Sequence, residues 1–286
     1  MLRSRTKSSA VNRKTIDALE AINRRFYRLH SREFSATRSR PWPGWQLVLD
    51  SFRRHGRALG SEHRDPIVDS LTPFEVLDAG CGNGRFARFL GSDGENGVRY
   101  LGADASLALV AEARQAGAQR PRLEASWVVA DLCGSETRSW PLGGRTGVAR
   151  TAVVFGVLHH VAAFDRRLAL LSSLGSTLEP GGLLAVSFWQ FGGRRRFLKR
   201  TIPWEEYNRR TADSVDVGEL EAGDSLLVWG EKGDTNERLR YCHYADPEES
   251  AELAAATGLE LVETFEADGR GDDLNLYYVL RRPSSI

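Results

Sequence analysis

The sequence of 286 residues has little cysteine and no long hydrophobic run. Its three cysteines, Cys81, Cys133 and Cys242, lie far apart and form no CxxC pair. This pattern argues against a disulfide framework and a Cys-rich zinc site, so we predict no metal site and a reducing, cytoplasmic location. No apolar run approaches the roughly 20 residues of a membrane span. We therefore predict no membrane association.

Net charge is also nearly missing, but the charges are unevenly placed. The formal net charge is +1, yet residues 1–60 hold 14 Lys/Arg against 4 Asp/Glu, whereas residues 219–273 hold 4 Lys/Arg against 16 Asp/Glu. A second basic run, RRRFLKR at 194–200, is followed by Trp204 and Tyr207. Basic residues interleaved with aromatic ones are typical of surfaces that follow nucleic-acid phosphates. An ordinary solvated face is the alternative interpretation.

The N-terminal part of the chain is predicted to be helical after a short tail. Residues 1–14 are basic with no hydrophobic segment after them, which predicts a disordered tail, or a transit peptide if the source is eukaryotic. Apolar residues at three- and four-residue spacing predict an amphipathic helix over 15–30. A second helix is predicted over Trp45–Leu59 and a connector over 60–73, so that residues 15–73 form a helical extension. The apolar positions of the first helix are Ile16, Leu19, Ile22, Phe26 and Leu29.

From Phe74 onward, short apolar runs alternate with helical patterns. Such alternation is typical of a parallel sheet covered on both faces, which predicts one α/β domain over residues 74–286. Ligands in such sheets bind beyond the carboxyl ends of the strands. Residues 190–236 interrupt the pattern and are predicted to be an inserted substrate element.

Regular structure is predicted to resume at Asp246. Asp246 is a helix N-cap candidate, Pro247 suits the first helical position and Gly258 suits the end, which predicts a helix through about Thr257. Two closing strands are predicted over 259–265 and 274–280, joined by a turn rich in Gly and Asp.

A glycine loop follows the first strand, in Asp78-Ala79-Gly80-Cys81-Gly82-Asn83-Gly84. Glycine lets the backbone turn sharply and approach a ligand, and the next helix points its positive end at the loop. The spacing is GxGxG, and Arg85 stands where a dinucleotide fingerprint needs a small residue, so NAD and FAD are disfavoured. A glycine loop alone is weak evidence, because glycine turns after strands are common.

Acidic residues end the next two strands. Asp104 ends VRYLGAD, 26 residues after Asp78, and is placed to accept both ribose hydroxyls of a nucleoside. Asp131 ends WVVAD and can accept from an adenine amino group while Leu132 covers the base. Any one of these acids could be a turn or N-cap residue. Three in order around a glycine loop indicate a nucleoside-binding site.

These motifs, with LEPGGLLAVSF at 178–188, resemble those of class I S-adenosyl-L-methionine (SAM)-dependent methyltransferases over roughly residues 74–190. The resemblance implies SAM as cofactor and a Rossmann-like, seven-stranded, mostly parallel sheet. Its last strand, 274–280, would run antiparallel between 183–188 and 259–265. The cofactor-binding residues that it implies are Asp78, Gly80, Cys81, Gly82, Asn83, Gly84, Asp104, Ala105, Asp131, Leu132 and Phe155.

Further segments resemble the tRNA wobble-uridine methyltransferases, which esterify 5-carboxymethyluridine in the anticodon. They are FSATRSRPWP at 34–43, VLHH at 157–160, GDSLLVW at 223–229 and RYCH at 240–243. The chain departs from that family's pattern before Trp229, at Cys242, and near the end, where Asp273-Leu274-Asn275-Leu276 stands in place of DNW. The resemblance implies a tRNA anticodon stem-loop as partner and RNA binding, and in eukaryotic members a small zinc-binding activator protein.

The chemistry of such an ester fits the residues. A carboxylate is ionised at neutral pH, so the enzyme needs alignment and no general base. Arg38 and Arg240 are predicted to hold the carboxylate, Trp229 to stack on the flipped base, and His159 or His160 to hydrogen-bond the substrate. His243, the last residue of RYCH, completes the predicted catalytic set.

Two other functions remain open from the sequence. A small-molecule carboxyl, O- or N-methyltransferase would leave the basic run merely solvated. A catalytically silent SAM-binding regulator would keep the glycine loop without a methyl acceptor. The presence of Arg38, His160 and Arg240 disfavours the silent protein.

Overall fold

The computed structural model describes residues 11–56, 74–92, 98–117, 123–132, 146–230 and 238–284. Most of the predicted tail, the predicted connector at 60–73 and Cys133 lie outside the described residues.

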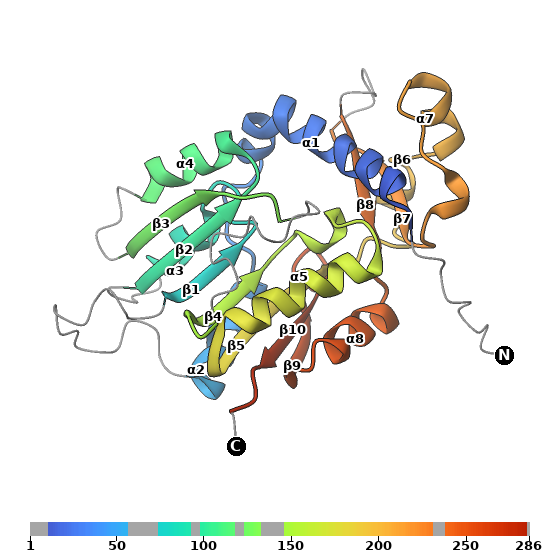
Figure 1. Ribbon diagram of the computed structural model, residues 1–286. Coiled ribbons are helices and arrows are strands. Elements are labelled where there is room, and N and C mark those ends of the chain that lie inside the picture. The colour runs from blue at the N-terminus through green and yellow to red at the C-terminus, as the bar shows by residue number, and fades with distance from the viewer. Residues whose placement is uncertain are drawn as a thin grey trace.

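A seven-stranded sheet forms the centre of the molecule (Figure 1), in the order β3-β2-β1-β4-β5-β10-β9. Neighbours from β3 to β5 pair in parallel, whereas β10 pairs antiparallel with both β5 and β9. The predicted Rossmann-like sheet and the place of its antiparallel last strand are therefore confirmed. The strands are β1 (Phe74–Ala79), β2 (Val98–Asp104), β3 (Leu123–Val129), β4 (Ala149–Val154), β5 (Leu178–Trp189), β9 (Glu260–Ala267) and β10 (Asn275–Arg281).

Helices cover both faces of this sheet, because consecutive strand residues point to opposite sides. Val76 packs with α2, α3 and α4 on one face, and Leu77 packs with α5 and α8 on the other. Both residues are fully buried, which explains why β1 is an unbroken apolar run. The helices are α2 (Gly44–His55), α3 (Arg85–Leu90), α4 (Leu107–Gly117), α5 (Phe164–Thr177) and α8 (Pro247–Ala256).

Helix α8 has the capping that its sequence predicts. The Asp246 side chain accepts a hydrogen bond from the Glu249 backbone N–H at 2.8 Å, with Pro247 at the first helical position. Gly258 follows at φ 73°, a conformation that glycine adopts without strain. Local chemistry alone sets both ends of this helix.

Helix α1 (Arg13–Ala36) is longer than predicted and lies across the top of the molecule in Figure 1, contacting α4 and the second sheet. Asn12 caps it by accepting from the Thr15 N–H at 2.9 Å. The predicted apolar face is buried except at Leu29, which is 45% exposed. His30 takes the buried position there, because the helical repeat of 3.6 residues carries the buried stripe one residue further.

The predicted insertion folds into a second, three-stranded sheet of order β6-β7-β8. The prediction that regular structure resumes only at Asp246 is wrong, because β8 (Leu239–His243) pairs antiparallel with β7 (Asp224–Val228). This element therefore runs from residue 190 to 243. Its other parts are α6 (Arg195–Leu198), β6 (Thr201–Ile202), α7 (Trp204–Arg210) and the 3-10 turn η3 (Val217–Glu219), and a further turn η2 (Leu158–His160) follows β4.

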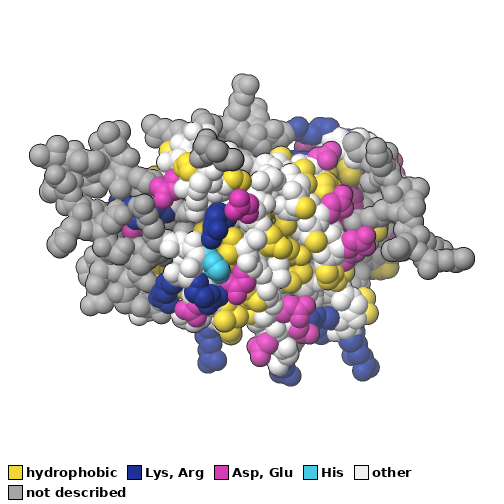
Figure 2. Space-filling model, turned by 90° about the horizontal axis from the view of Figure 1, so that it is seen from below, with side chains coloured by type: hydrophobic (Ala, Val, Ile, Leu, Met, Phe, Trp, Pro, Cys, Tyr) yellow, Lys and Arg dark blue, Asp and Glu magenta, His cyan; other side chains and the backbone are white. Residues whose placement is uncertain are grey.

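The surface mixes charges of both signs. Figure 2, from below, shows Lys and Arg side chains among acidic and exposed hydrophobic ones, so one charge does not dominate that face. None of the described helices is long and apolar enough to cross a membrane.

Candidate functional site

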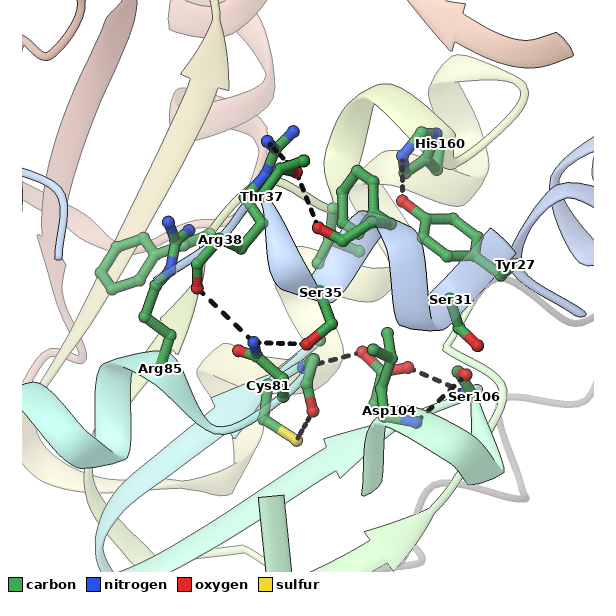
Figure 3. Close-up of a pocket in the computed structure, with 18 of the residues that line it drawn as sticks. Tyr27, Ser31, Ser35, Thr37, Arg38, Cys81, Arg85, Asp104, Ser106 and His160 are labelled. Atoms are coloured by element: carbon green, nitrogen blue, oxygen red, sulfur yellow. Dashed lines mark hydrogen bonds between the residues drawn. The ribbon is translucent and has the colours of Figure 1, made fainter. Parts of the chain in front are cut away.

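A large pocket of about 1470 Å³ opens beyond the carboxyl ends of the central strands. Its floor is the glycine loop and the residues after β2 and β3, and its walls are α1, the segment at 37–45 and the second sheet. Figure 3 shows Cys81 and Asp104 on the floor and Tyr27 on α1. This is the edge at which parallel α/β sheets bind ligands. Fifteen predicted site residues line it: Arg38, Asp78, Gly80, Cys81, Gly82, Asn83, Asp104, Ala105, Asp131, Leu132, Phe155, His159, His160, Trp229 and Arg240.

The three glycines of the loop have positive φ angles for different reasons. A Cβ on Gly80 would lie 2.1 Å from Val157, whereas one on Gly82 would meet nothing within 4 Å, so Gly82 presents open backbone to the pocket. A Cβ on Gly84 would lie 2.8 Å from Trp127. Gly84 does not line the pocket, and its predicted cofactor contact is replaced by close packing of α3 against β3 and α4.

Asp104 holds the glycine loop in place. Its carboxylate accepts from the Gly82 N–H at 2.9 Å and the Ser106 N–H at 2.8 Å. Burial raises its pKa, and these two hydrogen bonds oppose that rise. A carboxylate has about four acceptor positions, so two remain for hydroxyl donors from the pocket.

Asp78 lies beneath the loop and is 2% exposed. Burial raises its pKa to about 7, although the Tyr100 hydroxyl donates to it. Asn83 links the loop to α1, because its amide donates to the Ser35 hydroxyl at 2.8 Å. The end of α1 therefore closes this half of the pocket.

The part of the pocket beside Phe34, called the acceptor end below, carries two guanidinium groups, of Arg38 and Arg240. They lie over the Phe34 ring at 4.4 Å and 5.8 Å from its centroid. Burial and the charge of Arg240 lower the pKa of Arg38. Within the described part of the chain neither guanidinium pairs with a carboxylate: Arg38 donates to the Thr37 hydroxyl, and the buried Nε of Arg240 has no hydrogen-bond partner. Two close, unneutralised cations favour an anionic ligand.

Aromatic rings surround this arginine pair. Trp229 contacts Phe26 and Phe34 at centroid distances of 5.7 Å and 6.0 Å, and Arg240 lies 6.0 Å from the Trp189 ring. Flat apolar walls around a charged group suit a planar ligand that carries an anion.

His160 is tied into the protein. Its Nε2 lies 3.0 Å from the Tyr27 hydroxyl and its Nδ1 lies 3.0 Å from the Tyr241 carbonyl oxygen. Burial and Arg240 lower its pKa to about 3, and burial, together with the charge of His160, lowers the pKa of His159 well below its usual range. Both rings are therefore neutral at neutral pH, and His160 is a support of the pocket wall.

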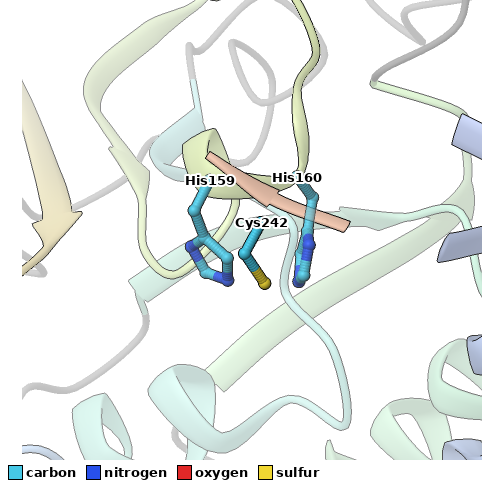
Figure 4. A group of neighbouring side chains, drawn as sticks. All are labelled: His159, His160 and Cys242. Atoms are coloured by element: carbon cyan, nitrogen blue, oxygen red, sulfur yellow. The ribbon is translucent and has the colours of Figure 1, made fainter. Parts of the chain in front are cut away.

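His159, His160 and Cys242 lie side by side (Figure 4), with one ligand-type atom of each within 4.8 Å of the others. Both ring nitrogens of His160 already have partners, and the positive charge of Arg240 acts on all three groups. A bound cation would have to break the hydrogen bonds of His160 and overcome repulsion by the positive charge of Arg240. We therefore assign no metal to this group.

His243 does not take the predicted catalytic position. It lies outside the pocket, 1% exposed, with Nδ1 2.8 Å from Asp224 and Nε2 3.0 Å from Glu249. Arg167 pairs with Glu249 at 2.7 Å and with Glu221 at 2.8 Å. This buried charge cluster joins α5 and α8 to the second sheet, so His243 supports β8, which carries Arg240.

Several residues that line the pocket were not predicted as site residues from the sequence. Tyr27 lies at the border of the apolar stripe of α1, a position that periodicity does not mark. Arg85 lies over Trp42 and Trp45 at 5.0 Å and 4.8 Å, and burial together with the charge of Arg38 lowers its pKa to about 10. Arg196 and Arg200 line the mouth. The sequence marks these two arginines only as members of the basic, aromatic-rich run at 194–200.

The cofactor half fits the nucleoside part of SAM. Gly82 has free space above its backbone, where a ligand can approach. Asp104 keeps acceptor positions for ribose hydroxyls. Asp131 and Leu132 line the pocket at the end of the next strand. Which of these residues contact the cofactor remains a prediction.

Comparisons with known proteins agree with this geometry. A family model described as a methyltransferase domain matches residues 51–264. A protein of Encephalitozoon cuniculi, whose name says methyltransferase and gives no substrate, is 27% identical over 85% of this chain and 90% of its own length. The mouse tRNA (carboxymethyluridine(34)-5-O)-methyltransferase is 28% identical over 60% of this chain, a match that spans 21% of the mouse protein.

Solved structures share the fold. A SAM-dependent methyltransferase from Methanosarcina mazei has a TM-score of 0.53 at 18% identity, covering 78% of this chain and 100% of its own. The 1,6-didemethyltoxoflavin-N1-methyltransferase of Burkholderia thailandensis has a TM-score of 0.54 at 16% identity, covering 98% and 94%. With the family match over most of its length and this fold, the chain belongs to the methyltransferase-domain family and is a SAM-dependent methyltransferase.

Proposed function

We propose that this enzyme methylates a carboxylate, that of 5-carboxymethyluridine at the tRNA wobble position, to the methyl ester. The observation that carries the proposal is the pair Arg38 and Arg240, which lie together at the acceptor end without a carboxylate partner among the described residues. SAM supplies a methyl group on a positively charged sulfur, which an ionised carboxylate oxygen can take directly.

The residues at this end do what such a reaction requires. Two guanidinium groups bind one carboxylate through parallel hydrogen bonds and fix the direction of its oxygens. Because the carboxylate is already ionised, no side chain has to remove a proton. His159 and His160, with their lowered pKa values, are poor bases, which agrees with a reaction that needs none.

The rest of the pocket suits a nucleotide in a folded RNA. Trp229, which is half-buried and lines the pocket, offers an aromatic ring for a flipped base. Arg196 and Arg200 line the mouth, where they are exposed and able to meet phosphates. The partial similarity to the mouse tRNA methyltransferase supports this substrate. We place the reaction in the cytoplasm.

A transfer assay tests the proposal. The purified protein is incubated with SAM and tRNA that carries unmodified carboxymethyluridine, with and without a small zinc-binding activator protein. Mass spectrometry of the nucleosides should show carboxymethyluridine gaining one methyl group. If it gains none in either arm, tRNA carboxymethyluridine is not the substrate.

A small carboxylic acid is the second candidate, because the arginine pair and aromatic wall suit any planar carboxylate. The basic mouth distinguishes the two, since binding of tRNA to it must weaken steeply with salt. Salt-independent activity on small acids, with no tRNA binding, would favour the second candidate. A silent SAM-binding protein would transfer no methyl group to either.

A further inference from the structure

Tyr27 lies where the two halves of the pocket meet. It is half-buried on α1 and lines the pocket. Burial raises its pKa to about 12, Arg240 opposes the rise and Asp104 adds to it. The phenol thus feels the charges of both the cofactor half and the acceptor half. In Figure 3 its ring lies between His160 and the loop of Asp104.

The hydrogen bonds of His160 decide which way the Tyr27 hydroxyl points. Nδ1 of His160 faces the Tyr241 carbonyl oxygen at 3.0 Å, and because a carbonyl only accepts, Nδ1 carries the proton. Asn23 Nδ2 lies 3.2 Å from the same nitrogen, but Asn23 has its own acceptor in the Tyr241 oxygen at 3.1 Å. The opposite tautomer would set two acceptors against each other.

The neutral ring therefore has its lone pair on Nε2. The Tyr27 hydroxyl lies 3.0 Å from Nε2 and must donate its proton there. Its oxygen is left with lone pairs only, as an acceptor on a residue that lines the pocket. A substrate carboxylate is repelled from such an oxygen and is directed to Arg38 and Arg240 instead.

A methyl group on a positively charged sulfur is a weak hydrogen-bond donor through its polarised C–H bonds. The methyl group is the part of SAM that has to reach from the cofactor half toward the acceptor end. A hydrogen-bond acceptor where these two parts of the pocket meet would therefore contact the methyl group. We propose that the Tyr27 oxygen accepts C–H hydrogen bonds from the methyl group of SAM and orients it toward the arginine pair, and that His160 is the positioning residue that keeps this oxygen an acceptor.

Cofactor binding alone tests this, with no acceptor present. Isothermal titration calorimetry compares SAM with S-adenosylhomocysteine, which lacks the methyl group. Tyr27→Phe keeps the ring and removes the oxygen, so it should weaken SAM binding about two- to fivefold and leave S-adenosylhomocysteine binding unchanged. Tyr207→Phe, on α7 and outside the pocket, is the matched control and should change neither affinity.

SAM labelled with ¹³C in its methyl group gives a second readout. The methyl proton resonance of bound SAM should move upfield in Tyr27→Phe, because a C–H···O contact shifts it downfield. Equal weakening of both ligands, or no weakening of either, would overturn the proposal, since Tyr27 would then only shape the pocket or not touch the methyl group.

The role of His160 is tested by a double-mutant cycle. His160→Phe should lower the preference for SAM in the same direction as Tyr27→Phe, and the double variant should lose no more than Tyr27→Phe alone. Additive losses would overturn the positioning role. Thermal melting shows whether the His160→Phe variant is folded. If it is unfolded, the binding of SAM and S-adenosylhomocysteine to Tyr27→Phe still tests the contact with the methyl group. If Tyr27→Phe lowers the preference for SAM as predicted but the protein transfers no methyl group to tRNA, only the proposed substrate is rejected.

Discussion

At the scale of single residues, the function depends on the division between Arg38 and Asp104. Arg38 faces the acceptor end and has no carboxylate partner among the described residues, so Arg38→Ala should weaken substrate binding and leave SAM binding intact. We expect kcat/KM to fall roughly tenfold to a hundredfold, the loss expected for hydrogen bonds to a charged group. Arg38→Lys should restore little, because an ammonium cannot bind bidentately. Arg32→Ala, exposed on α1 and outside the pocket, is the control.

Substitution of Asp104 should weaken the binding of SAM, which Arg38→Ala leaves intact. Asp104→Asn removes the negative charge and replaces an acceptor by an amide, so calorimetry should show SAM binding weakened by roughly tenfold. A stable fold is expected, because the amide oxygen can still accept from the Gly82 N–H. If Asp104→Asn and Arg38→Ala lower SAM affinity equally, the division of the pocket into two halves is wrong.

At the scale of elements, β8 is held at its middle residue and at its C-terminal end. The Asn23 side chain pairs with the backbone of Tyr241, accepting from its N–H at 2.9 Å and donating to its oxygen at 3.1 Å. At the far end His243 sits among Asp224, Glu249 and Glu221, beside Arg167. These contacts fix the strand that presents Arg240 to the pocket.

The His243 cluster predicts a pH dependence of stability. Burial alone would lower the pKa of His243, but the hydrogen bonds that its ring donates to the Asp224 and Glu249 carboxylates outweigh burial and raise it. A pKa raised on folding contributes stability that is complete below the unfolded value of about 6.5 and is lost as pH rises through the folded value. The free energy of unfolding of His243→Gln and of the unmodified protein is measured in urea from about pH 6 to about pH 9. The gap between the two proteins should be largest at the acid end. A gap that widens toward alkaline pH would contradict this assignment.

The same elements show what the sequence can predict. The ends of α8 follow from Asp246, Pro247 and Gly258, because capping is local. The second sheet was not predicted, because β7 and β8 become strands only through pairing with each other and packing against α1. Propensity within a short segment does not contain that information.

The same difference, between local sequence pattern and contacts of distant segments, decides which site residues could be predicted from the sequence. Asp104 and Asp131 were found because they stand at strand ends, which sequence pattern locates. His243 was misplaced because its four-residue motif does not say which side of β8 faces the pocket. Arg240 and His243 lie three positions apart on one strand, and alternation sends them to opposite sides.

At the scale of the whole molecule, the pocket lies between the sheet that binds the cofactor and the second sheet with its basic α6. Burial and the charges of Arg194 and Arg200 lower the pKa of Arg196, as expected where cations crowd together. Arg196→Ala with Arg200→Ala should weaken tRNA binding at low salt and reduce the slope of log K against log salt by about one to two. Fluorescence anisotropy over a salt series measures this, and Arg13→Ala, at the exposed start of α1, is the control. An unchanged slope would show that RNA phosphates do not meet α6.

The central claim is that the arginine-lined end receives a carboxylate, so that the product is a methyl ester. Esters are cleaved by mild alkali, whereas methyl groups on ether oxygen or on nitrogen are not. The most direct measurement uses SAM with a radioactive methyl group, tRNA carrying carboxymethyluridine, and a count of volatile methanol after alkali treatment. We predict that the transferred label is released as methanol and that Arg38→Ala transfers it roughly tenfold to a hundredfold more slowly. Label that stays on the RNA after alkali would contradict it.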